Sequence, residues 1–586
     1  MEKRWVLKPQ GNKDLVRHLS KVLNINENLA NLLAQRGVST FEQAKAYFRP
    51  QLEHLHDPFL MKDMHLAVER VERALKKGEK ILVYGDYDVD GTTAVALVYT
   101  FLKTLHDKVD FYVPDRYSEG YGISFKGIDF ARENGFSLII ALDCGIKAVE
   151  KVAYANERNI DFIICDHHRP GDKLPEAIAI LDPKREDCEY PYKELAGCGI
   201  GFKLIQAFAW KNNIAFSSLE EYLDLVVVSI ASDIVPITGE NRVLAYYGLK
   251  RINSQPRAGL EAILNVSNKY SKSVGVEGNN RQYIRELTIN DLVFIVGPRI
   301  NAAGRIKSAR ASVELLITKD PLIAFDLGNE INKQNTDRKT LDTQATHDAL
   351  EMLIADPKLN KRKSTVLYHP EWHKGVIGIV ASRLIETYYR PTIVLTKSEG
   401  LVTGSARSIK GFDIYDAVDA CGDLLEHFGG HMYAAGLSLK PENLDKFKER
   451  FEEYVSTHLP IEISLPEIEI DAMLNLQDIQ KKFYDVLKQF APFGPGNMSP
   501  VFETDNVVDA GKAKIVGNNH LKLEVFQHDV RSEPISSIAF GQGGEENFEY
   551  IRDGNPFNIC YHIEENEWNG KKSFQLNIKD IKPYQG

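Results

Sequence analysis

The chain has 586 residues, 43% of them hydrophobic and 26% charged, an ordinary composition for a globular protein of about three or four domains. Its formal charge of −10 excludes a protein-wide basic field, so any nucleic-acid site has to rest on local basic clusters. The six cysteines form no C-x-x-C pair, which argues against structural zinc and fits free thiols in a reducing cytoplasm. No signal-peptide core and no apolar run of transmembrane length is found, so we expect a cytoplasmic protein that does not enter a membrane.

Residues 1–75 have the spacing of amphipathic helices. Leu15, Leu19 and Val22, and then Leu29 and Leu33, recur at intervals of three or four residues. No residue of this segment suggests chemistry. We expect it to pack as a helical cap on the first α/β domain.

Residues 81–91 join an apolar run to three carboxylates at alternate positions. Residues 81–84 predict a buried strand of a parallel sheet, Asp86, Asp88 and Asp90 follow it, and residues 92–99 have helical spacing. Clustered carboxylates repel one another unless a proton or a cation lies among them. Oxygen ligands at this density suit Mg²⁺ or Mn²⁺ better than Zn²⁺. The alternative is a solvated acidic turn in which Asp90 caps the helix.

Further apolar runs read as strands, and each is followed by acidic or imidazole side chains. Residues 138–142 precede Asp143, residues 162–165 precede Asp166, His167 and His168, and residues 177–181 precede Asp182. Helical segments between the runs indicate a mostly parallel sheet. Because the carboxyl ends of parallel strands share one edge, we expect Asp86, Asp88, Asp143 and His167 to converge there.

Two segments near these strands carry further candidates. Residues 116–122 are rich in glycine and tyrosine, which fits either a loop that reaches over the site or an ordinary surface turn. Residues 222–236 form a long apolar element, strand or helix, that ends at Asp233 and is stopped by Pro236. Asp233 is a candidate fourth carboxylate, although alone it would more often be a cap.

Residues 298–310 hold four basic residues and no acid. Small residues let a backbone approach a ligand closely, and arginine suits phosphate oxygens, but a solvated helix face has the same pattern. The charged, helical residues 321–353 then predict a connector helix between domains.

A second α/β region begins near residue 364. Residues 372–383 predict a loop that leads into a helix N-terminus, which is a natural anion site, and residues 392–395 predict a strand. The segments 404–408 and 428–436 contain glycine and small residues. In the second, His431 precedes residues compatible with a helix, which fits either a phosphate cradle or a close-packed helix entry.

From residue 466 the chain changes to short alternating segments, such as 521–526 and 574–578. This pattern predicts a small all-β module, plausibly an OB-type barrel. Lys512, Lys514 and Lys522 are candidates for its binding face, or ordinary solvated lysines.

The ordered motifs resemble those of the DHH phosphoesterase superfamily. The matching residues are Asp86-Tyr87-Asp88-Val89-Asp90-Gly91, Asp143-Cys144-Gly145, Asp166-His167-His168, Ser232-Asp233 and, for the DHH-associated domain, Gly429-Gly430-His431 with Ala434-Ala435-Gly436. The resemblance covers nearly the whole chain and implies an α/β fold. It implies a helical segment (1–75), a parallel-sheet DHH domain (76–318), a connector helix (319–360), a smaller α/β DHH-associated substrate-binding domain (361–462) and an all-β OB-like nucleic-acid-binding barrel (463–586).

The resemblance also implies a role for each matching residue. Metal ligands would be Asp86, Asp88, Asp143, His167 and Asp233, with Asp143 bridging two Mn²⁺ or Mg²⁺ ions. The catalytic group would comprise His168 beside the scissile phosphate, Asp143, and the supporting residues Asp90 and Asp166. DNA phosphates would be held by Arg299, Asn301, Arg305, Ser405, Arg407, Gly430 and His431. The chain lacks the histidine that some smaller members carry just before the first aspartate, so one metal position is expected to bind weakly or only with substrate.

The activity implied by this resemblance is a metal-dependent 5′→3′ exonuclease that degrades single-stranded DNA to 5′-mononucleotides in DNA repair and recombination. It implies a monomer, with a single-strand-binding protein and a helicase as candidate partners. One alternative is a superfamily phosphodiesterase that acts on short oligonucleotides or cyclic dinucleotides. The other is an inactive nucleic-acid-binding scaffold, which loss of metal ligands would mark.

Overall fold

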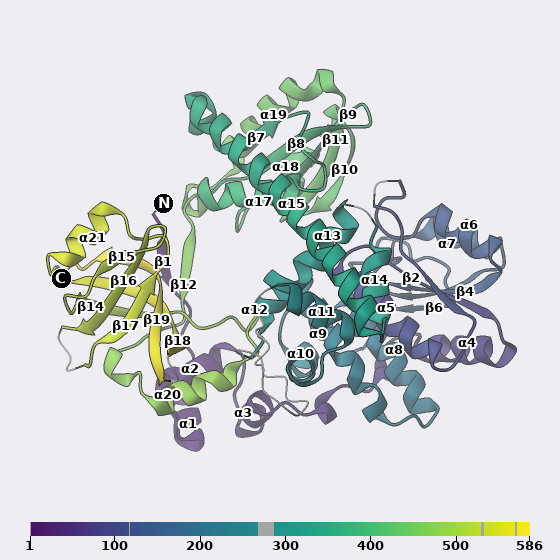
Figure 1. The fold of residues 1–586 in the computed structure, drawn as a ribbon, viewed down its shortest axis with the longest axis horizontal. Coiled ribbons are helices and arrows are strands. Elements are labelled where there is room, and N and C mark those ends of the chain that lie inside the picture. Colours follow the sequence, from purple (N-terminus) through teal and green to yellow (C-terminus); the bar gives the residue numbers. More distant parts are fainter. Residues whose placement is uncertain are drawn as a thin grey trace. The chain divides into compact units, whose positions relative to one another are not determined.

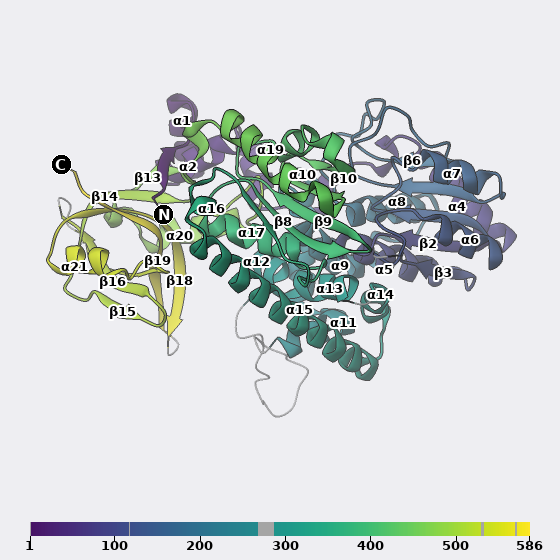
Figure 2. The same ribbon diagram turned by 90° about the horizontal axis from the view of Figure 1, so that it is seen from above.

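The computed structural model describes residues 2–116, 118–267, 286–306, 308–528, 532–568 and 571–585. The chain divides into two compact units, one formed by residues 52–464 and the other by residues 1–51 together with residues 465–586 (Figures 1 and 2). Tyr117 and Lys307, which belong to two of the sequence segments discussed above, lie outside the described residues.

The first sheet of the larger unit is parallel throughout, with the strand order β3-β2-β4-β5-β6. Its strands are β2 (Lys80–Gly85), β3 (Val109–Tyr112), β4 (Phe136–Leu142), β5 (Asp161–Cys165) and β6 (Ala179–Leu181). All but β3 coincide with the predicted apolar runs, as expected for strands that helices cover on both faces. The sequence pattern misses β3, because this edge strand is short and alternates buried with more exposed residues.

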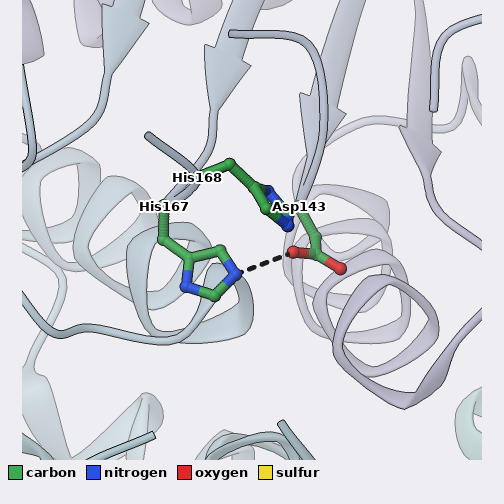
Figure 3. Close-up of side chains that lie close together, drawn as sticks. All are labelled: Asp143, His167 and His168. Carbon is green, nitrogen blue, oxygen red and sulfur yellow. Dashed lines mark ion pairs between the residues drawn. The ribbon is translucent and has the colours of Figure 1, made fainter. Parts of the chain in front are cut away.

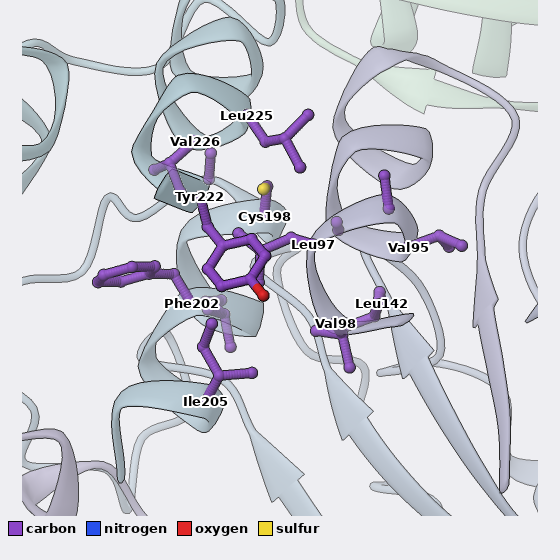
Figure 4. Packing of buried hydrophobic residues seen from close by; sticks show 14 of the residues in the cluster. Val95, Leu97, Val98, Leu142, Cys198, Phe202, Ile205, Tyr222, Leu225 and Val226 are labelled. Atoms are coloured by element: carbon purple, nitrogen blue, oxygen red, sulfur yellow. The ribbon is translucent and has the colours of Figure 1, made fainter. Parts of the chain in front are cut away.

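Helices cover both faces of this sheet (Figure 1). One face carries α6 (Phe125–Glu133) and α7 (Val149–Asn156), and the other carries α4 (Met64–Lys77), α5 (Val89–Lys103) and α8 (Gly197–Lys211). Figure 4 shows the second interface, where Val98 of α5, Leu142 of β4 and Phe202 of α8 belong to one buried core. Because α5 begins directly after β2, this packing fixes the acidic loop between them at the carboxyl edge of the sheet.

In the described residues between this sheet and residue 317, the regular elements are helices. Those after α8 include α9 (Leu223–Ser232), α10 (Gly239–Ser254), α11 (Ala258–Val266), α12 (Ile289–Asp291), a π-helical turn (Leu292–Val296), α13 (Gly297–Ile306) and α14 (Arg310–Ile317). The apolar element that the sequence left as strand or helix is therefore the helix α9. The predicted connector is the helix α15 (Pro321–Ala355), which begins where the Asp320 carboxylate accepts hydrogen bonds from the Leu322 and Ile323 N–H groups.

The second sheet of the larger unit has the order β10-β11-β9-β8-β7 and is antiparallel except for the β7–β8 pair. Its strands are β7 (Thr365–Tyr368), β8 (Thr392–Ser398), β9 (Leu401–Arg407), β10 (Leu425–His431) and β11 (Ala434–Leu439). The helices around it are α16 (Pro357–Lys361), α17 (Ile377–Thr387), α18 (Ile414–Asp419) and α19 (Leu444–His458). The predicted loop before a helix at residues 372–383 is confirmed by α17.

The glycine-rich residues 428–436 form a β-hairpin, so the helix entry considered for them is wrong. Gly430 of β10 lies opposite Ala435 of β11. A Cβ atom at Gly430 would lie 2.3 Å from the carbonyl oxygen of Ala434, so only glycine permits this approach of the strands. Small residues favour close packing of either element type, which is why their size alone did not distinguish a strand from a helix.

The smaller unit contains a closed β-barrel. Its strands are β14 (Phe502–Asp509), β16 (His520–Gln527), β17 (Ile535–Ala539), β18 (Phe557–Trp568) and β19 (Lys571–Pro583), with β13 (Ala472–Met473) and β15 (Lys514–Val516) added to them. The ring runs β14-β16-β17-β19-β18 and closes on β14; only β17 and β19 within it are parallel. With α21 (Glu545–Arg552) between β17 and β18, this is the five-stranded topology of an OB fold.

Residues 1–51 belong to this barrel unit, so the expectation that residues 1–75 cap the first α/β domain is wrong for them and holds only for the later part, where α4 packs on the first sheet. β1 (Arg4–Leu7) pairs in parallel with β12 (Glu467–Ile470). The helices α1 (Lys13–Leu23), α2 (Glu27–Gln35) and α3 (Phe41–Phe48) share one apolar core with α20 (Lys481–Leu487) and the barrel strands. Amphipathic spacing reveals that a helix has an apolar face, but it does not reveal which partner covers that face.

Candidate metal centre

The parallel sheet brings most of the candidate ligands to one edge. Asp86 follows β2, Asp143 follows β4 and His167 follows β5, while Asp233 is the C-cap residue of α9. Asp88 caps the N-terminus of α5, where its Oδ1 accepts a hydrogen bond of 3.0 Å from the Gly91 N–H. These positions lie where open α/β sheets place their ligand sites.

His167 is surrounded by carboxylates. Its Nε2 atom lies 3.2 Å from Oδ1 of Asp143 (Figure 3), 3.6 Å from Oδ2 of Asp233 and 3.7 Å from Oδ2 of Asp90. Asp88 is within hydrogen-bonding reach of Asp143. Carboxylates packed this closely are stable together only if protons or cations neutralise them.

Several buried atoms of this cluster have no hydrogen-bond partner. They are Oδ2 of Asp86, Oδ1 of Asp143 and Nδ1 of His167. Buried polar atoms are almost always satisfied in proteins, so free carboxylate oxygens beside an imidazole indicate a missing partner. Oxygen donors with one imidazole nitrogen are ligands that suit Mn²⁺ or Mg²⁺. The residues present therefore fit a divalent cation.

Asp90 holds two helices against the site. Its Oδ1 accepts hydrogen bonds of 2.7 Å from the Cys198 N–H and the Ser229 hydroxyl, and its Oδ2 accepts one of 2.7 Å from the Gly197 N–H. The carboxylate thus caps the N-terminus of α8 and binds α9 at the same time. This geometry supports the expected role of Asp90 as a residue that positions the ligands.

Asp166 orients His168. Its Oδ1 lies 2.7 Å from Nδ1 of His168, and its two oxygens also accept the backbone N–H groups of His167, His168 and Ile146. The Nε2 atom on the other side of the His168 ring lies 3.0 Å from the Tyr121 hydroxyl. Tyr121 therefore brings the later part of the segment 116–122 to the site, so the described residues 118–122 are not an unrelated surface turn.

The backbone is strained at Asp143 and at the residue directly after Asp233. Asp143 has a φ of 59°, and Ile234, directly after Asp233, also has a φ of 59°. A β-branched residue rarely adopts this left-handed conformation, which costs of order 1–3 kcal/mol. Strain of this kind persists where packing fixes the backbone, and here it lies at one candidate ligand and beside another.

Burial and crowding shift the protonation of the cluster. Burial, and then the charge of Asp88, raises the pKa of Asp86 to about 8. Burial, and then the charge of Asp90, raises the pKa of Asp233 to about 8 and that of Asp143 well above its usual range. Burial alone would lower the pKa of His168, but the hydrogen bond to Asp166 and the nearby carboxylates outweigh it and raise the pKa to about 9.

The predicted phosphate-binding residues of α13 already contact protein groups. Oδ1 of Asn301 accepts a hydrogen bond of 3.1 Å from the Val89 N–H, which supports the acidic loop. Arg299 donates to Oδ1 of Asn332 at 3.0 Å, and Arg305 donates to the Gly375 carbonyl at 3.0 Å. These three side chains therefore bind three different parts of the chain.

The predicted phosphate-binding residues of the second sheet lie at one end of neighbouring strands. Arg407 of β9 is opposite Ala434 of β11, which is opposite His431 of β10, and Gly430 is the next residue of β10. Arg407 donates a hydrogen bond of 2.9 Å to the Ser405 hydroxyl. Gly378 lies in the first turn of α17, and a Cβ atom there would lie 2.7 Å from Nη2 of Arg407. Arg407 and Ser405 therefore both lie against the N-terminus of α17.

Three residues near the centre had no role assigned from sequence. Tyr121 contacts His168, Ser229 donates to Asp90, and Gly197 packs so tightly that a Cβ atom there would lie 2.7 Å from Cβ of Asp143. The glycines at residues 197 and 199, at the start of a helix, were the signal available for Gly197. The glycine- and tyrosine-rich composition of residues 116–122 was the signal available for Tyr121, whereas the Ser229 hydroxyl carries none in a single sequence.

Among the residues that the structure describes, no helix is both long enough and apolar enough to cross a membrane.

Three family models match the chain in the order expected from its motifs. The DHH family N-terminal domain matches residues 80–230, the DHHA1 domain matches residues 361–457, and the RecJ OB domain matches residues 470–580. The second and third matches coincide with the second sheet and the barrel.

Curated relatives match over nearly the full chain. The single-stranded-DNA-specific exonuclease RecJ of Bacillus subtilis is 36% identical over 98% of this chain and 70% of the relative. The proteins of the same name from Salmonella typhimurium and Escherichia coli are 34% and 33% identical, each over 95% of this chain and 96% of the relative.

Solved structures agree with these matches. The crystal structure of RecJ in complex with Mn²⁺ from Thermus thermophilus has a TM-score of 0.82 and 27% identity, and it covers 100% of this chain and 80% of that chain. A structure of exonuclease RecJ bound to manganese has a TM-score of 0.58 and 31% identity, and it covers 70% of this chain and 97% of that chain. The chain therefore belongs to the RecJ family of DHH proteins.

Proposed function

We propose that this protein is a metal-dependent exonuclease that degrades single-stranded DNA from the 5′ end to 5′-mononucleotides, in DNA repair and recombination. The observation that carries the proposal is the cluster around His167, in which Asp86 and Asp143 have buried oxygens without hydrogen-bond partners. The names of the matching relatives supply the substrate class. The 5′→3′ polarity is an expectation from the family resemblance.

Asp86, Asp88, Asp143, His167 and Asp233 would hold Mn²⁺ or Mg²⁺, with two ions proposed. Such ions would lower the pKa of a water so that it loses a proton and can attack phosphorus. They would also stabilise charge at the attacking and leaving oxygens. The chain's own residues orient the reaction. Asp166 keeps a proton on Nδ1 of His168, so that a cationic imidazole, 43% exposed, faces the entering phosphate.

The second sheet would hold the strand near this centre. Arg407 beside Ser405 and the N-terminus of α17 combine a guanidinium, a hydroxyl and the positive end of a helix, which together favour phosphate. Gly430 and His431 lie two strands away in the same register. Arg299, Asn301 and Arg305 remain proposed phosphate ligands. To bind the strand, each would have to share or leave the hydrogen bond that it forms with the protein.

The barrel favours a long strand over the short-substrate alternative. OB barrels bind single strands through stacking and a basic groove. Lys514 of β15 is paired directly opposite Lys522 of β16, which places two like charges side by side on that surface. We propose that a single-strand-binding protein and a helicase assist the enzyme, that it acts as a monomer, and that it works in the cytoplasm, where its six free, buried cysteines stay reduced.

The test uses single strands labelled at the 5′ or the 3′ end, with Mn²⁺, and a duplex of the same sequence as control. We expect immediate release of labelled mononucleotide from the 5′-labelled single strand only. Chelation of the metal and the Asp143→Ala substitution should each abolish release. Full activity of Asp143→Ala, or equal digestion of a dinucleotide and a long strand, would refute the proposal.

A further inference from the structure

A groove on the barrel unit lies beside the first residues of β17 and β19. It has a volume of about 760 Å³, which is within the range of ligand sites in proteins. Its apolar side includes Ile535 and Phe574, which also pack against the core of the barrel unit. The groove is lined by residues 476–480, by residues 532–536 at the start of β17, by Glu524 of β16, and by Ser573 and Phe574 at the start of β19.

The charged residues that line this groove, among those that the structure describes, are all acidic. They are Asp478, Glu524 and Glu533. Glu524 forms an ion pair of 3.5 Å with Lys512, whereas within the described part of the chain Asp478 and Glu533 form none. Carboxylates repel the phosphates of a nucleic-acid strand and attract lysine and arginine side chains. The groove therefore suits a basic ligand and not DNA.

β19 has an unpaired edge in this groove. Its parallel pairing with β17 begins where Ser536 lies opposite Gln575, and Pro534, just before β17, has no backbone N–H to continue the ladder. Ser573 and Phe574 pair with β18 on the other side, but no strand in the described residues pairs with them on the groove side. Because neighbouring residues of a strand direct their N–H and C=O groups to opposite edges, one of these two presents both groups to the groove.

We propose that this groove binds an extended, lysine- or arginine-rich segment of a partner protein, which adds to the unpaired edge of β19 as a further strand. An added strand gains affinity from main-chain hydrogen bonds and specificity from its alternate side chains. The segment would direct apolar side chains toward Ile535 and Phe574 and basic ones toward Asp478 and the other two carboxylates. Lys514 and Lys522, which the barrel offers to DNA, do not line the groove, so this surface is separate from them.

The experiment measures binding of a fluorescein-labelled decapeptide of alternating valine and lysine to the full chain, by fluorescence anisotropy in EDTA at physiological ionic strength. A peptide of alternating valine and glutamate should not bind. Asp478→Asn combined with Glu533→Gln should weaken binding of the lysine peptide about fivefold, as expected for the loss of two surface ion pairs. Glu545→Gln combined with Glu546→Gln, at two exposed residues of α21 outside the groove, is the matched control and should leave binding unchanged.

Two further measurements separate strand addition from attraction between charges alone. N-methylation of every backbone amide of the lysine peptide should abolish binding, because methylated amides cannot donate to β19. Amide hydrogen exchange over residues 572–575 should slow when the unmethylated peptide binds.

Four outcomes would overturn the proposal. They are no binding of the lysine peptide to the wild type, equal binding to the wild type and to the Asp478→Asn, Glu533→Gln variant, equal binding of the methylated peptide, and weaker binding of oligothymidylate by that variant. The last result would mean that the groove holds DNA. None of these measurements depends on nuclease activity, so the proposal stands or falls separately from the proposed function.

Discussion

Nε2 of His167 lies 3.2 Å from Oδ1 of Asp143, although the two residues follow different strands. The contact exists because β4 and β5 are neighbouring parallel strands that end at the same edge. It places an imidazole nitrogen and a free carboxylate oxygen in position to share one cation.

The first prediction concerns this pair. His167→Ala removes the imidazole nitrogen that lies within 3.7 Å of carboxylate oxygens of Asp143, Asp233 and Asp90. Loss of residues that merely support ligands costs about 10–100-fold in metal affinity, so we expect a larger loss here. The measurement is the Mn²⁺-induced rise in melting temperature, which should vanish. His347→Asn, at an exposed site on α15, should retain the full rise.

The second prediction tests how tightly α8 holds Asp143. In Gly197→Ala the new Cβ would lie 2.7 Å from Cβ and 2.9 Å from Oδ1 of Asp143, so the carboxylate has to move. A displacement near 1 Å can cost about 100-fold in rate. Gly199→Ala is the matched control, because its Cβ would meet nothing closer than 3.6 Å. Equal nuclease activity of the two variants would show that Asp143 does not need its present position.

These residues also show how far the sequence reaches. β2, β4 and β5 were predictable because strands buried on both faces need continuous apolar runs, and parallel pairing then forces Asp86, Asp143 and His167 to one edge. The OB-type barrel was predictable from alternation and turns. A single sequence records which residues are apolar or charged, but much less about the distant groups that contact them.

The remaining features depend on such distant contacts. Neither the pairing of β1 with β12 nor the packing of α1, α2 and α3 on the barrel leaves a trace in local spacing. The same holds for the Tyr121 hydroxyl beside His168 and for the hairpin at residues 425–439. The missed edge strand β3 has too few buried residues to form an apolar run.

The third prediction concerns a buried ion pair remote from the proposed chemistry. Nζ of Lys203 lies 3.0 Å from Oε1 of Glu240, which also accepts the His56 N–H, and Oε2 accepts the Tyr190 hydroxyl. Glu240→Gln leaves the lysine charge buried without a counter-charge, although its Nζ still donates to the His56 carbonyl, and we expect a loss of about 3–5 kcal/mol in unfolding free energy.

Two further variants test the electrostatic origin of that loss. Lys203→Met combined with Glu240→Gln removes both charges. The glutamine carbonyl oxygen can still accept the His56 N–H, and its amide group can donate to the Tyr190 hydroxyl oxygen, so part of the stability should return in urea unfolding. Glu186→Gln, at an exposed site, should leave stability unchanged. A double variant no more stable than Glu240→Gln would mean that packing, not the unpaired charge, dominates.

The fourth prediction is a pH dependence that originates at Asp182, directly after β6. Burial raises its pKa from 3.8 to about 7, and its Oδ2 has no hydrogen-bond partner. The folded state therefore holds a proton that the unfolded chain releases, and the stability due to this proton is complete below pH 4 and is lost as the pH rises through 7. At 1.36 kcal/mol per pH unit the loss is about 4 kcal/mol.

Asp182→Asn does not titrate, so its stability relative to the wild type should rise between pH 4 and pH 7 and then level off. Urea unfolding of both proteins across this range measures the difference, with Asp172→Asn, at an exposed site, as the control whose difference stays flat. Parallel profiles for Asp182→Asn and the wild type would show that the buried carboxylate finds a partner in solution, since only a partner could return its pKa to the usual range.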